Sequence, residues 1–414
     1  MENASNTPSL RFRGYTDAWG QERLGDICSI TKGSGLSKEN LEYEGANKCV
    51  LYGHLYTDYG FFIKDVHWGT NVLPDNPIYS EVGDVLVPGS DTTPTGCARA
   101  ASIDVSGVLL GGDINVFKHS DNIDGDFLSL SINHERPAMI SMIKGTSVRH
   151  LTGKDLRDLA VKFPKEVKEQ RCISSVFIKL DSLLSLHQRK LDKLQAIKKS
   201  LLQKMFPAEG EDRPQIRFAG YTDAWGQERL GDMGETFTGL SGKSKEDFGH
   251  GNAKFVTYMN VYLNPIADLK MLESVEVDNK QTKVQYGDMF FTTSSETPEE
   301  VGMSSIWLGN IENLYLNSFC FGYRLSKKMD PYFMGYLMRS PEIRNKFIFL
   351  AQGISRYNIS KNHVMEMEVA FPSLEEQKKI GQLLYSVDSL LSLHQRKLEK
   401  LQQIKKALLE QMFC

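Results

Sequence analysis

The feature that most constrains the fold is an internal repetition, in which two stretches of the chain recur almost unchanged. Residues 181–206, DSLLSLHQRKLDKLQAIKKSLLQKMF, return as residues 388–413 with 21 of 26 positions identical. A second stretch, RFRGYTDAWGQERLGD at residues 11–26, returns at residues 217–232 with a single substitution. We call these 16-residue copies the tryptophan segments. The 414-residue chain is therefore a tandem duplication, and its two halves are expected to share one fold.

The longer repeat has the apolar spacing of a helix. Steps of three and four separate the members of one apolar stripe, which are Ile173, Phe177, Leu180, Leu184, Leu191, Leu194, Ile197, Leu201 and Met205. Pro164 and Pro372 are expected to begin the helices, because a first helical turn does not need the N–H that proline lacks. From Pro164 to Phe206 is about 43 residues, or roughly 60 Å, and so long a helix with one apolar stripe needs a partner.

The predicted partner of each long helix is its own copy, and the two would pair as an antiparallel coiled coil. The Lys and Arg residues of both helices are interpreted as a solvated outer face. The residues expected to form the pairing are Leu180, Leu184, His187, Leu191, Leu194, Leu201, Leu391, His394, Leu398, Leu401 and Leu408.

Composition indicates folded domains, since 41% of the residues are hydrophobic and 24% are charged. No apolar run approaches the roughly 20 residues that span a bilayer, so we expect a cytoplasmic protein. The six cysteines include no C-x-x-C pair, which predicts reduced thiols and neither disulfides nor a metal site. The net charge of -3 does not by itself indicate nucleic acid, and DNA contacts would have to come from local basic loops.

Between the repeats, the two halves diverge in sequence but keep a common pattern of strands. KCVLYGHLY at residues 48–56 parallels KFVTYMNVY at residues 254–262, and a Gly-Asp strand at residues 83–87 parallels one at residues 287–291. A hydroxyl-rich loop follows each Gly-Asp strand. The expected fold is α+β, with two similar α/β domains separated by the two long helices in a pseudo-two-fold repeat. The predicted divisions are a first domain at 1–163, a first helix at 164–206, a linker at 207–216, a second domain at 217–371 and a second helix at 372–414.

No catalytic constellation stands out, because the domain histidines lack metal-ligand spacing and no serine lies in a G-x-S-x-G motif. The chain is therefore predicted to have no active site of its own. Halves that keep their helices while their loops diverge are interpreted as one scaffold with two binding specificities. The tryptophan segments have two open interpretations, which are a buried core around Trp19 and Trp225 and a docking surface for two identical partners.

The motifs together resemble a known family. They are the repeated G-Y-T-D-A-W segment, the Gly-Asp strand with its Ser/Thr loop, a Phe-Pro followed by Glu-Gln at the start of each long helix, and M-F-P-x-x-G-E at residues 205–211. This ordered set resembles the DNA specificity (S) subunit of type I restriction-modification systems over essentially the whole chain.

The resemblance implies a non-catalytic subunit whose two target-recognition domains each read one part of a split, asymmetric DNA sequence. It also implies that the helices act as a ruler and as a platform for two methyltransferase (M) subunits, with motor-nuclease (R) subunits joining them. No cofactor is implied in this chain: S-adenosylmethionine would bind the M subunits, and ATP and Mg the R subunits. The rival predictions are a duplicated scaffold without sequence readout and a stand-alone DNA methyltransferase or nuclease with an unrecognised site.

Candidate DNA contacts are basic, amide, hydroxyl and aromatic side chains on the divergent loops, because such groups read base edges and phosphates. In the first domain they are Lys32, Ser34, Ser37, Lys38, His54, Tyr56, Thr92, Thr93, Arg149 and His150. In the second domain they are Lys243, Ser244, Lys245, Asn260, Tyr262, Thr292, Ser294, Ser295, Arg356, Tyr357 and Asn358.

Overall fold

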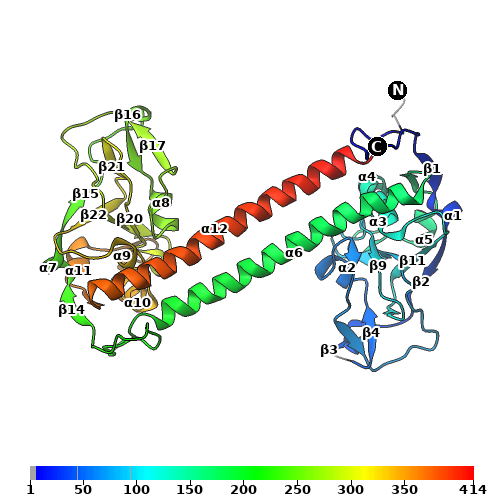
Figure 1. Ribbon diagram of the computed structural model, residues 1–414, viewed down its shortest axis with the longest axis horizontal. Helices are drawn as coiled ribbons and strands as arrows, with labels where there is room; N and C mark the ends of the chain where they lie inside the picture. Colours follow the sequence, from blue (N-terminus) through cyan, green and yellow to red (C-terminus); the bar gives the residue numbers. More distant parts are fainter. Residues whose placement is uncertain (1–5, 44, 94) are drawn as a thin grey trace. The chain divides into compact units, whose positions relative to one another are not determined.

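The chain divides into two compact units of similar construction. The computed structural model describes residues 6–43, 45–93 and 95–414. Unit 1 comprises Met1–Gln188 with Arg396–Cys414, and unit 2 comprises Arg189–Gln395. Each unit therefore holds one globular part and a portion of both long helices, α6 (Val167–Lys204) and α12 (Leu374–Gln411), as Figure 1 shows.

Unit 1 is built on a five-stranded main sheet with the order β2-β11-β7-β9-β5. Its strands are β2 (Cys28–Lys32), β5 (Phe62–Ile63), β7 (Val85–Pro88), β9 (Ala101–Ile103) and β11 (Ile114–His119). Every residue of β7 is buried, as expected for a central apolar strand covered on both faces. Helix α3 (Gly125–His134) packs on this sheet and contributes to the main core of the unit.

Shorter elements complete unit 1. A smaller sheet has the order β10-β4-β6-β3, while β1 pairs with β13 and β8 pairs with β12. Figure 1 shows β3 and β4 on the side of the main sheet away from α6. These elements are β1 (Gly20–Arg23), α1 (Leu24–Ile27), η1 (Lys38–Asn40), β3 (Glu42–Tyr43), β4 (Asn47–Val50), α2 (His54–Thr57), β6 (Trp68–Thr70), β8 (Ser90–Asp91), β10 (Leu109–Leu110), α4 (Arg136–Met142), β12 (Arg149–His150), α5 (Gly153–Leu156) and β13 (Ala160–Phe163).

Unit 2 repeats this plan. Its main sheet has the order β15-β22-β18-β20, its smaller sheet β17-β16-β21, and its two-stranded pairs are β14-β24 and β19-β23. The elements are β14 (Gly226–Arg229), α7 (Leu230–Met233), β15 (Gly234–Thr238), η2 (Lys245–Asp247), β16 (Phe248–Val256), α8 (Tyr258–Leu263), β17 (Leu272–Val275), β18 (Met289–Thr292), β19 (Ser294–Ser295), η3 (Pro298–Glu300), β20 (Ser304–Ile306), β21 (Leu314–Leu316), β22 (Cys320–Leu325), α9 (Pro331–Leu337), α10 (Pro341–Leu350), β23 (Tyr357–Asn358), α11 (Lys361–Met365) and β24 (Glu368–Phe371).

The long helices begin slightly later than expected. Helix α6 starts at Val167 and α12 at Leu374, so Pro164 and Pro372 precede the helices, and their predicted place in the first turn is wrong. The reason is that each proline directly follows the last strand of its globular part, where the chain is still extended. The carbonyl of Pro164 instead accepts a hydrogen bond from Gln170 Nε2 at 2.8 Å, and that of Pro372 accepts one from Gln377 Nε2 at 2.9 Å.

The two long helices pack together within each unit through a reciprocal ion pair. In unit 1, Lys405 Nζ of α12 lies 2.5 Å from Asp181 Oδ1 of α6. In unit 2, Lys198 Nζ of α6 lies 2.6 Å from Asp388 Oδ1 of α12. Positions 181 and 388, like positions 198 and 405, are equivalent in the repeat. The early part of one helix therefore meets the late part of the other, which confirms the predicted antiparallel pairing.

The end of each helix repeat is anchored in a globular core. Phe413 packs edge-on against Trp19 in unit 1, with ring centroids 5.8 Å apart, and Phe206 packs edge-on against Trp225 in unit 2 at 6.2 Å. Both tryptophans are buried, at 2% and 4% exposure, as their core interpretation requires. The adjoining backbone repeats as well, because Leu10 N donates to Gln411 O and Ile216 N to Lys204 O.

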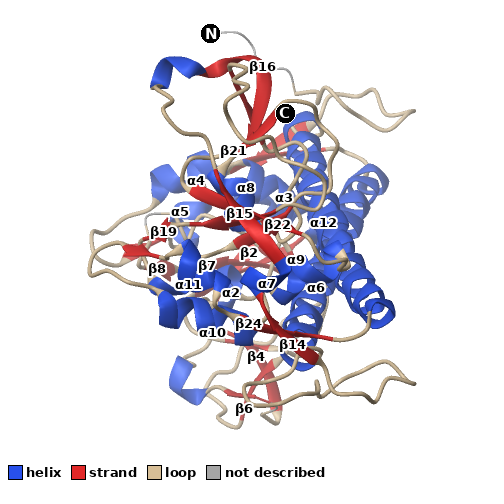
Figure 2. Ribbon diagram, turned by 90° about the vertical axis from the view of Figure 1, so that its left-hand side faces the viewer, coloured by secondary structure: helices blue, strands red, loops and turns tan. Residues whose placement is uncertain are grey.

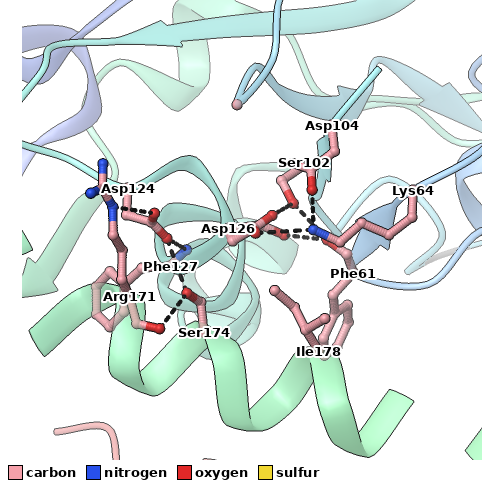
Figure 3. Close-up of polar contacts among 12 residues, drawn as sticks. Phe61, Lys64, Ser102, Asp104, Asp124, Asp126, Phe127, Arg171, Ser174 and Ile178 are labelled. Atoms are coloured by element: carbon pink, nitrogen blue, oxygen red, sulfur yellow. Dashed lines mark hydrogen bonds and ion pairs between the residues drawn. The ribbon is translucent and has the colours of Figure 1, made fainter. Parts of the chain in front are cut away.

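Polar contacts tie helix α3 of unit 1 to α6 on one side and to the sheet on the other. Asp124 Oδ1 caps α3 by accepting from Phe127 N at 3.0 Å, and it also accepts from Ser174 Oγ of α6 at 3.1 Å. Two residues further on, Asp126 Oδ1 accepts from Ser102 Oγ of β9 at 2.5 Å, and its Oδ2 accepts from Lys64 Nζ at 3.1 Å (Figure 3). The first turn of α3 thereby fixes where the long helix leaves the globular part.

Candidate nucleic-acid interface

In each unit, the hydroxyl-rich loop pairs with a hairpin from a distant part of the sequence. β8 runs antiparallel to β12 in unit 1, with Asp91 opposite Arg149, and β19 runs antiparallel to β23 in unit 2, with Ser295 opposite Tyr357. Figure 2 shows β8 and β19 each on the side of its own unit that faces away from the long helices. In each unit the hydroxyl-rich loop therefore lies on the side opposite the nearly identical helices.

The tip of each hairpin is shaped by a glycine. Gly145 and Gly353 have φ angles of 104° and 147°, which side chains rarely adopt. A Cβ added at Gly353 would lie 2.0 Å from Arg356 O, and one at Gly145 would lie 2.2 Å from Val148 O. These glycines allow a tight turn that presents exposed side chains, including Ile354 with 97% exposure.

A cluster of polar groups lies beside the hairpin of unit 1. Lys32 Nζ at the end of β2 forms an ion pair with Asp113 Oδ1 at 3.0 Å. Burial alone would raise the pKa of Asp113, but hydrogen bonds from Ser90 and Lys32, the charge of Lys32 and the nearby His150 outweigh it and lower that pKa. Lys32 and His150, predicted from separate segments, are thus brought to one carboxylate.

Asp91 organises the hydroxyl loop of unit 1. Its Oδ1 accepts from Thr92 N at 2.7 Å, and its Oδ2 accepts from the Thr93 hydroxyl. The carboxylate also meets Tyr56 of α2: burial chiefly raises the pKa of Tyr56 to about 12, and the charge of Asp91 and a hydrogen bond to it contribute. The tyrosine is therefore neutral near pH 7.

Unit 2 has a cavity of about 320 Å³ at the equivalent place. The rings of Tyr258 and Tyr262, one helical turn apart on α8, stack with centroids 6.1 Å apart and an interplanar angle of 16°. Tyr258 Oη donates to Ser294 O at 2.9 Å, which fixes the helix against β19. The lining residues are Tyr258, Met259, Tyr262, Ser294, Ser295, Glu296, Glu300, Phe319 and Arg356.

Glu300 is the hydrogen-bond centre of this cavity. Its Oε1 accepts from Tyr262 Oη at 2.6 Å and its Oε2 accepts from Ser295 Oγ at 3.0 Å. These two hydrogen bonds lower the pKa of Glu300. The bond between Tyr262 and Glu300 is also the largest cause of the raised pKa of Tyr262. A charged carboxylate and a neutral phenol are therefore held together on the loop surface.

The predicted DNA contacts differ in their exposure to solvent. Those exposed to solvent are Lys32, Ser37, Lys38, Thr92, Thr93, His150, Ser244, Lys245, Arg356 and Asn358. Those partly exposed are Tyr56, Arg149, Lys243, Tyr262 and Tyr357. Those buried are Ser34, His54, Asn260, Thr292, Ser294 and Ser295.

Internal hydrogen bonds explain several of the buried candidates. Asn260 Nδ2 donates to the carbonyls of Asp268 and Met271 at 2.8 and 3.0 Å, and Ser34 Oγ donates to Leu110 O at 2.9 Å. His54 Nδ1 accepts from Leu51 N at 3.2 Å. These side chains hold loop backbone in place, so the proposals below do not use them as base contacts.

The candidates near η1 and η2 belong to a different part of each unit. Ser37 and Ser244 form capping boxes at the starts of these short 3-10 turns. Lys243 Nζ pairs with Asp278 Oδ2 at 3.0 Å, and η2 packs against β16 of the smaller sheet. These residues therefore lie with the smaller sheet, whereas the hairpins pair with the loop that follows the main-sheet strand.

Five residues of the unit 2 cavity were not predicted, namely Tyr258, Met259, Glu296, Glu300 and Phe319. Tyr258 could have been found, because it lies four residues before Tyr262 on one helix face. Phe319 gave no such signal, since only the pairing of strands brings it to the hairpin.

The predicted helix-pairing residues lie away from this surface, on α6 and α12. Leu191 and Leu398 are buried. The others are partly buried, namely Leu180, Leu184, His187, Leu194, Leu201, Leu391, His394, Leu401 and Leu408. Ile197, assigned to the stripe from its spacing, is 38% exposed.

Three features of the described chain bear on cofactors and membranes. All six cysteines are free. Among residues 6–43, 45–93 and 95–414, no group of three or more His, Cys, Asp or Glu side chains could hold a metal ion. None of the helices in these ranges is long and apolar enough to cross a membrane.

Comparison with known proteins agrees with the duplicated architecture. The family described as type I restriction modification DNA specificity domain matches residues 16–196 and 222–403, once in each half. The type I restriction enzyme MjaVIII specificity subunit of Methanocaldococcus jannaschii is 21% identical over 441 residues, which cover 99% of this chain and 94% of that protein. The crystal structure of the type I restriction-modification system S subunit from M. genitalium has the same fold, with a TM-score of 0.63, 15% identity and 99% of both chains covered.

Proposed function

The chain belongs to the type I restriction-modification DNA specificity family, and from this premise we propose that each globular part reads one half of a split, asymmetric DNA target. As a specificity subunit, the chain recognises the DNA target and is the non-catalytic part of the restriction enzyme. We assign residues 1–163 and 217–371 to target recognition, residues 164–206 and 372–414 to the two segments that contain the spacer helices α6 and α12, and residues 207–216 to the linker.

The observation that supports this proposal is that one scaffold is used twice with different side chains in the equivalent loops and hairpins. Asp91 faces Arg149 across the strand pair of unit 1, whereas Ser295 faces Tyr357 across that of unit 2. Each base pair presents its own pattern of donors and acceptors in the major groove, so different side chains at equivalent points select different bases. Two unlike half-sequences are the expected result.

The repeated segments support a pair of identical partners. Near-verbatim helices and tryptophan segments give each half the same surface, and equal surfaces bind copies of one protein. We propose that these partners are two methyltransferase (M) subunits, with motor-nuclease (R) subunits joining the complex. S-adenosylmethionine would then bind the M subunits, and ATP and Mg the R subunits.

Selection from a random DNA pool tests the proposal. The chain, assembled with its methyltransferase subunits, should enrich a two-part motif with a gap of constant length. A single continuous motif, or no motif, would contradict it. The isolated chain with added methyl donor should methylate nothing, and turnover by the chain alone would reveal an active site of its own.

A further inference from the structure

The two recognition surfaces share one feature although their loop sequences differ. In unit 1 Tyr56 lies near the Asp91 carboxylate, whose charge adds to the effect of burial in raising the pKa of the tyrosine. In unit 2 Tyr262 Oη donates to Glu300 Oε1 at 2.6 Å. Tyr56 and Tyr262 are equivalent positions of the repeat, at the ends of KCVLYGHLY and KFVTYMNVY. Each surface therefore holds the same tyrosine against a carboxylate.

The carboxylates come from different positions of the loop. Asp91 is equivalent to Ser295, because these residues face Arg149 and Tyr357 at the same register of β8-β12 and β19-β23. Glu300 lies five residues after Ser295, and the residue five after Asp91 is Gly96. The acidic residue and the small residue have thus exchanged positions: unit 1 has Asp91 and Gly96, whereas unit 2 has Ser295 and Glu300 at the equivalent positions.

Space explains why the exchange must involve both positions. A Cβ added at Gly96 would lie 1.3 Å from Asp91 Oδ2, so unit 1 cannot hold Asp91 and a side chain at position 96 in this arrangement. In unit 2 the smaller Ser295 leaves room for Glu300 and donates to its Oε2 at 3.0 Å. The acid has moved five residues along the loop and still reaches the tyrosine.

A carboxylate on a DNA-reading surface has an electrostatic cost, because it repels phosphates. Glu300 lines the cavity of unit 2, so its presence there indicates a task. A tyrosine that donates its only proton to a carboxylate keeps oxygen lone pairs that can only accept. In the major groove the donors that match such an acceptor are the exocyclic amino groups of adenine and cytosine.

Resting on the function proposed above, we propose that Tyr56 and Tyr262 are specificity-determining residues, each accepting a hydrogen bond from the amino group of an adenine or cytosine in its half-site. Asp91 and Glu300 are positioning residues that fix the direction of the tyrosine proton. In unit 2 the tyrosine lines a cavity of about 320 Å³ into which a base edge can reach.

A double-mutant cycle between protein and DNA tests the tyrosine. Binding is measured with the chain assembled with its methyltransferase subunits, on duplexes in which each adenine or cytosine of the half-site is replaced in turn by an analogue lacking the amino group. At one position, Tyr262→Phe and the analogue should each weaken binding by roughly 3- to 10-fold, and together no more than either alone. Independent losses at every position would overturn the proposal.

Matched variants test the carboxylate. Glu300→Gly should lose selectivity at that base, and adding Ser295→Asp should restore it by giving unit 2 the arrangement of unit 1. The reverse exchange, Asp91→Ser with Gly96→Glu, should leave unit 1 selective. Tyr286→Phe, which changes an exposed tyrosine outside the cavity lining, should have no effect.

Thermal unfolding and assembly with the methyltransferase subunits check that each variant is folded. A folded double variant that stays as weak as Glu300→Gly would show that the carboxylate position is not interchangeable, and would overturn its positioning role. If the wild-type complex selects a split target but Tyr262→Phe changes nothing, this inference alone fails. If the wild-type complex selects no split target, the proposed function fails.

Discussion

Arg356 is the residue of unit 2 whose placement best suits direct reading of a base. It is exposed next to the hairpin tip and lines the cavity formed by Tyr262 and Glu300. An arginine can donate two parallel hydrogen bonds to guanine, which is the commonest specific contact in the major groove. Its repeat equivalent is Val148, so the contact would belong to one half-site only.

Replacing Arg356 by alanine is expected to weaken binding to the cognate site by about 1 to 3 kcal/mol and to relax one base position. The measurement is binding of the assembled complex to a panel of duplexes that differ at single positions of the half-site. Arg213→Ala, which changes an exposed arginine of the linker, provides the control. An equal loss on cognate and random DNA would show that Arg356 contacts phosphate.

Individual contacts were only partly predictable from sequence. A loop position rich in hydroxyl, amide and basic groups indicates a binding surface, and Arg356 and Tyr262 do line the cavity. Asn260 has the same chemistry but uses its amide to hold the backbone of Asp268 and Met271. Sequence does not distinguish these uses, because the direction of a side chain depends on the packing of distant segments.

At the scale of elements, the ends of the helix repeats anchor the globular cores. Phe413 is 4% exposed and touches Trp19, Phe127 and Phe177, all of them buried residues of unit 1. Phe413→Ala should therefore destabilise unit 1 by about 3 to 5 kcal/mol, the usual cost of removing a buried phenylalanine ring.

Hydrogen exchange resolved by segment measures this effect. Strands β7 and β11 of unit 1 should exchange faster in Phe413→Ala, while β18 and β22 of unit 2 should change less. Phe206→Ala should give the opposite pattern, and Leu393→Ala, at a helix residue with 40% exposure, should alter neither. Equal acceleration in both units would contradict separate anchoring.

The helix pair is expected to set the gap between the half-sites. Four residues inserted after Gln188 and four after Gln395 add about one turn, or roughly 6 Å, to both helices. At about 3.4 Å per base pair, the spacer in the target should grow by about one to two base pairs. Methylation of duplexes with different spacer lengths measures this change. An active variant that still prefers the original spacer would contradict the claim that helix length sets the spacer.

The elements were predictable where the signal is local. The long helices follow from the three- and four-residue spacing of residues such as Phe177 and Leu191. The predicted helix starts were wrong because Pro164 directly follows strand β13, where the backbone is still extended. The pairing of β8 with β12 was not predicted. About 60 residues separate the two strands, and each is too short for its sequence pattern to indicate the strand with which it pairs.

At the scale of the whole molecule, duplication explains why one chain can recognise an asymmetric target. The helix ion pairs, Asp181 with Lys405 and Asp388 with Lys198, repeat because the helices are nearly identical. The loop surfaces diverge, although a carboxylate lies near the equivalent tyrosine in both units, with Asp91 near Tyr56 and Glu300 accepting from Tyr262. The repeated scaffold and the loops that differ between the halves thus occupy separate parts of each unit.

The central claim is that each half of the chain selects its own half of the target. Methylation mapping in cells tests it, with the wild-type chain and with a variant in which residues 217–371 are replaced by residues 11–163. The wild type should give a split motif with two unlike parts, and the variant a split motif whose two parts are the same half-sequence in inverted orientation. An unchanged motif in the variant, or a continuous motif in the wild type, would contradict the account.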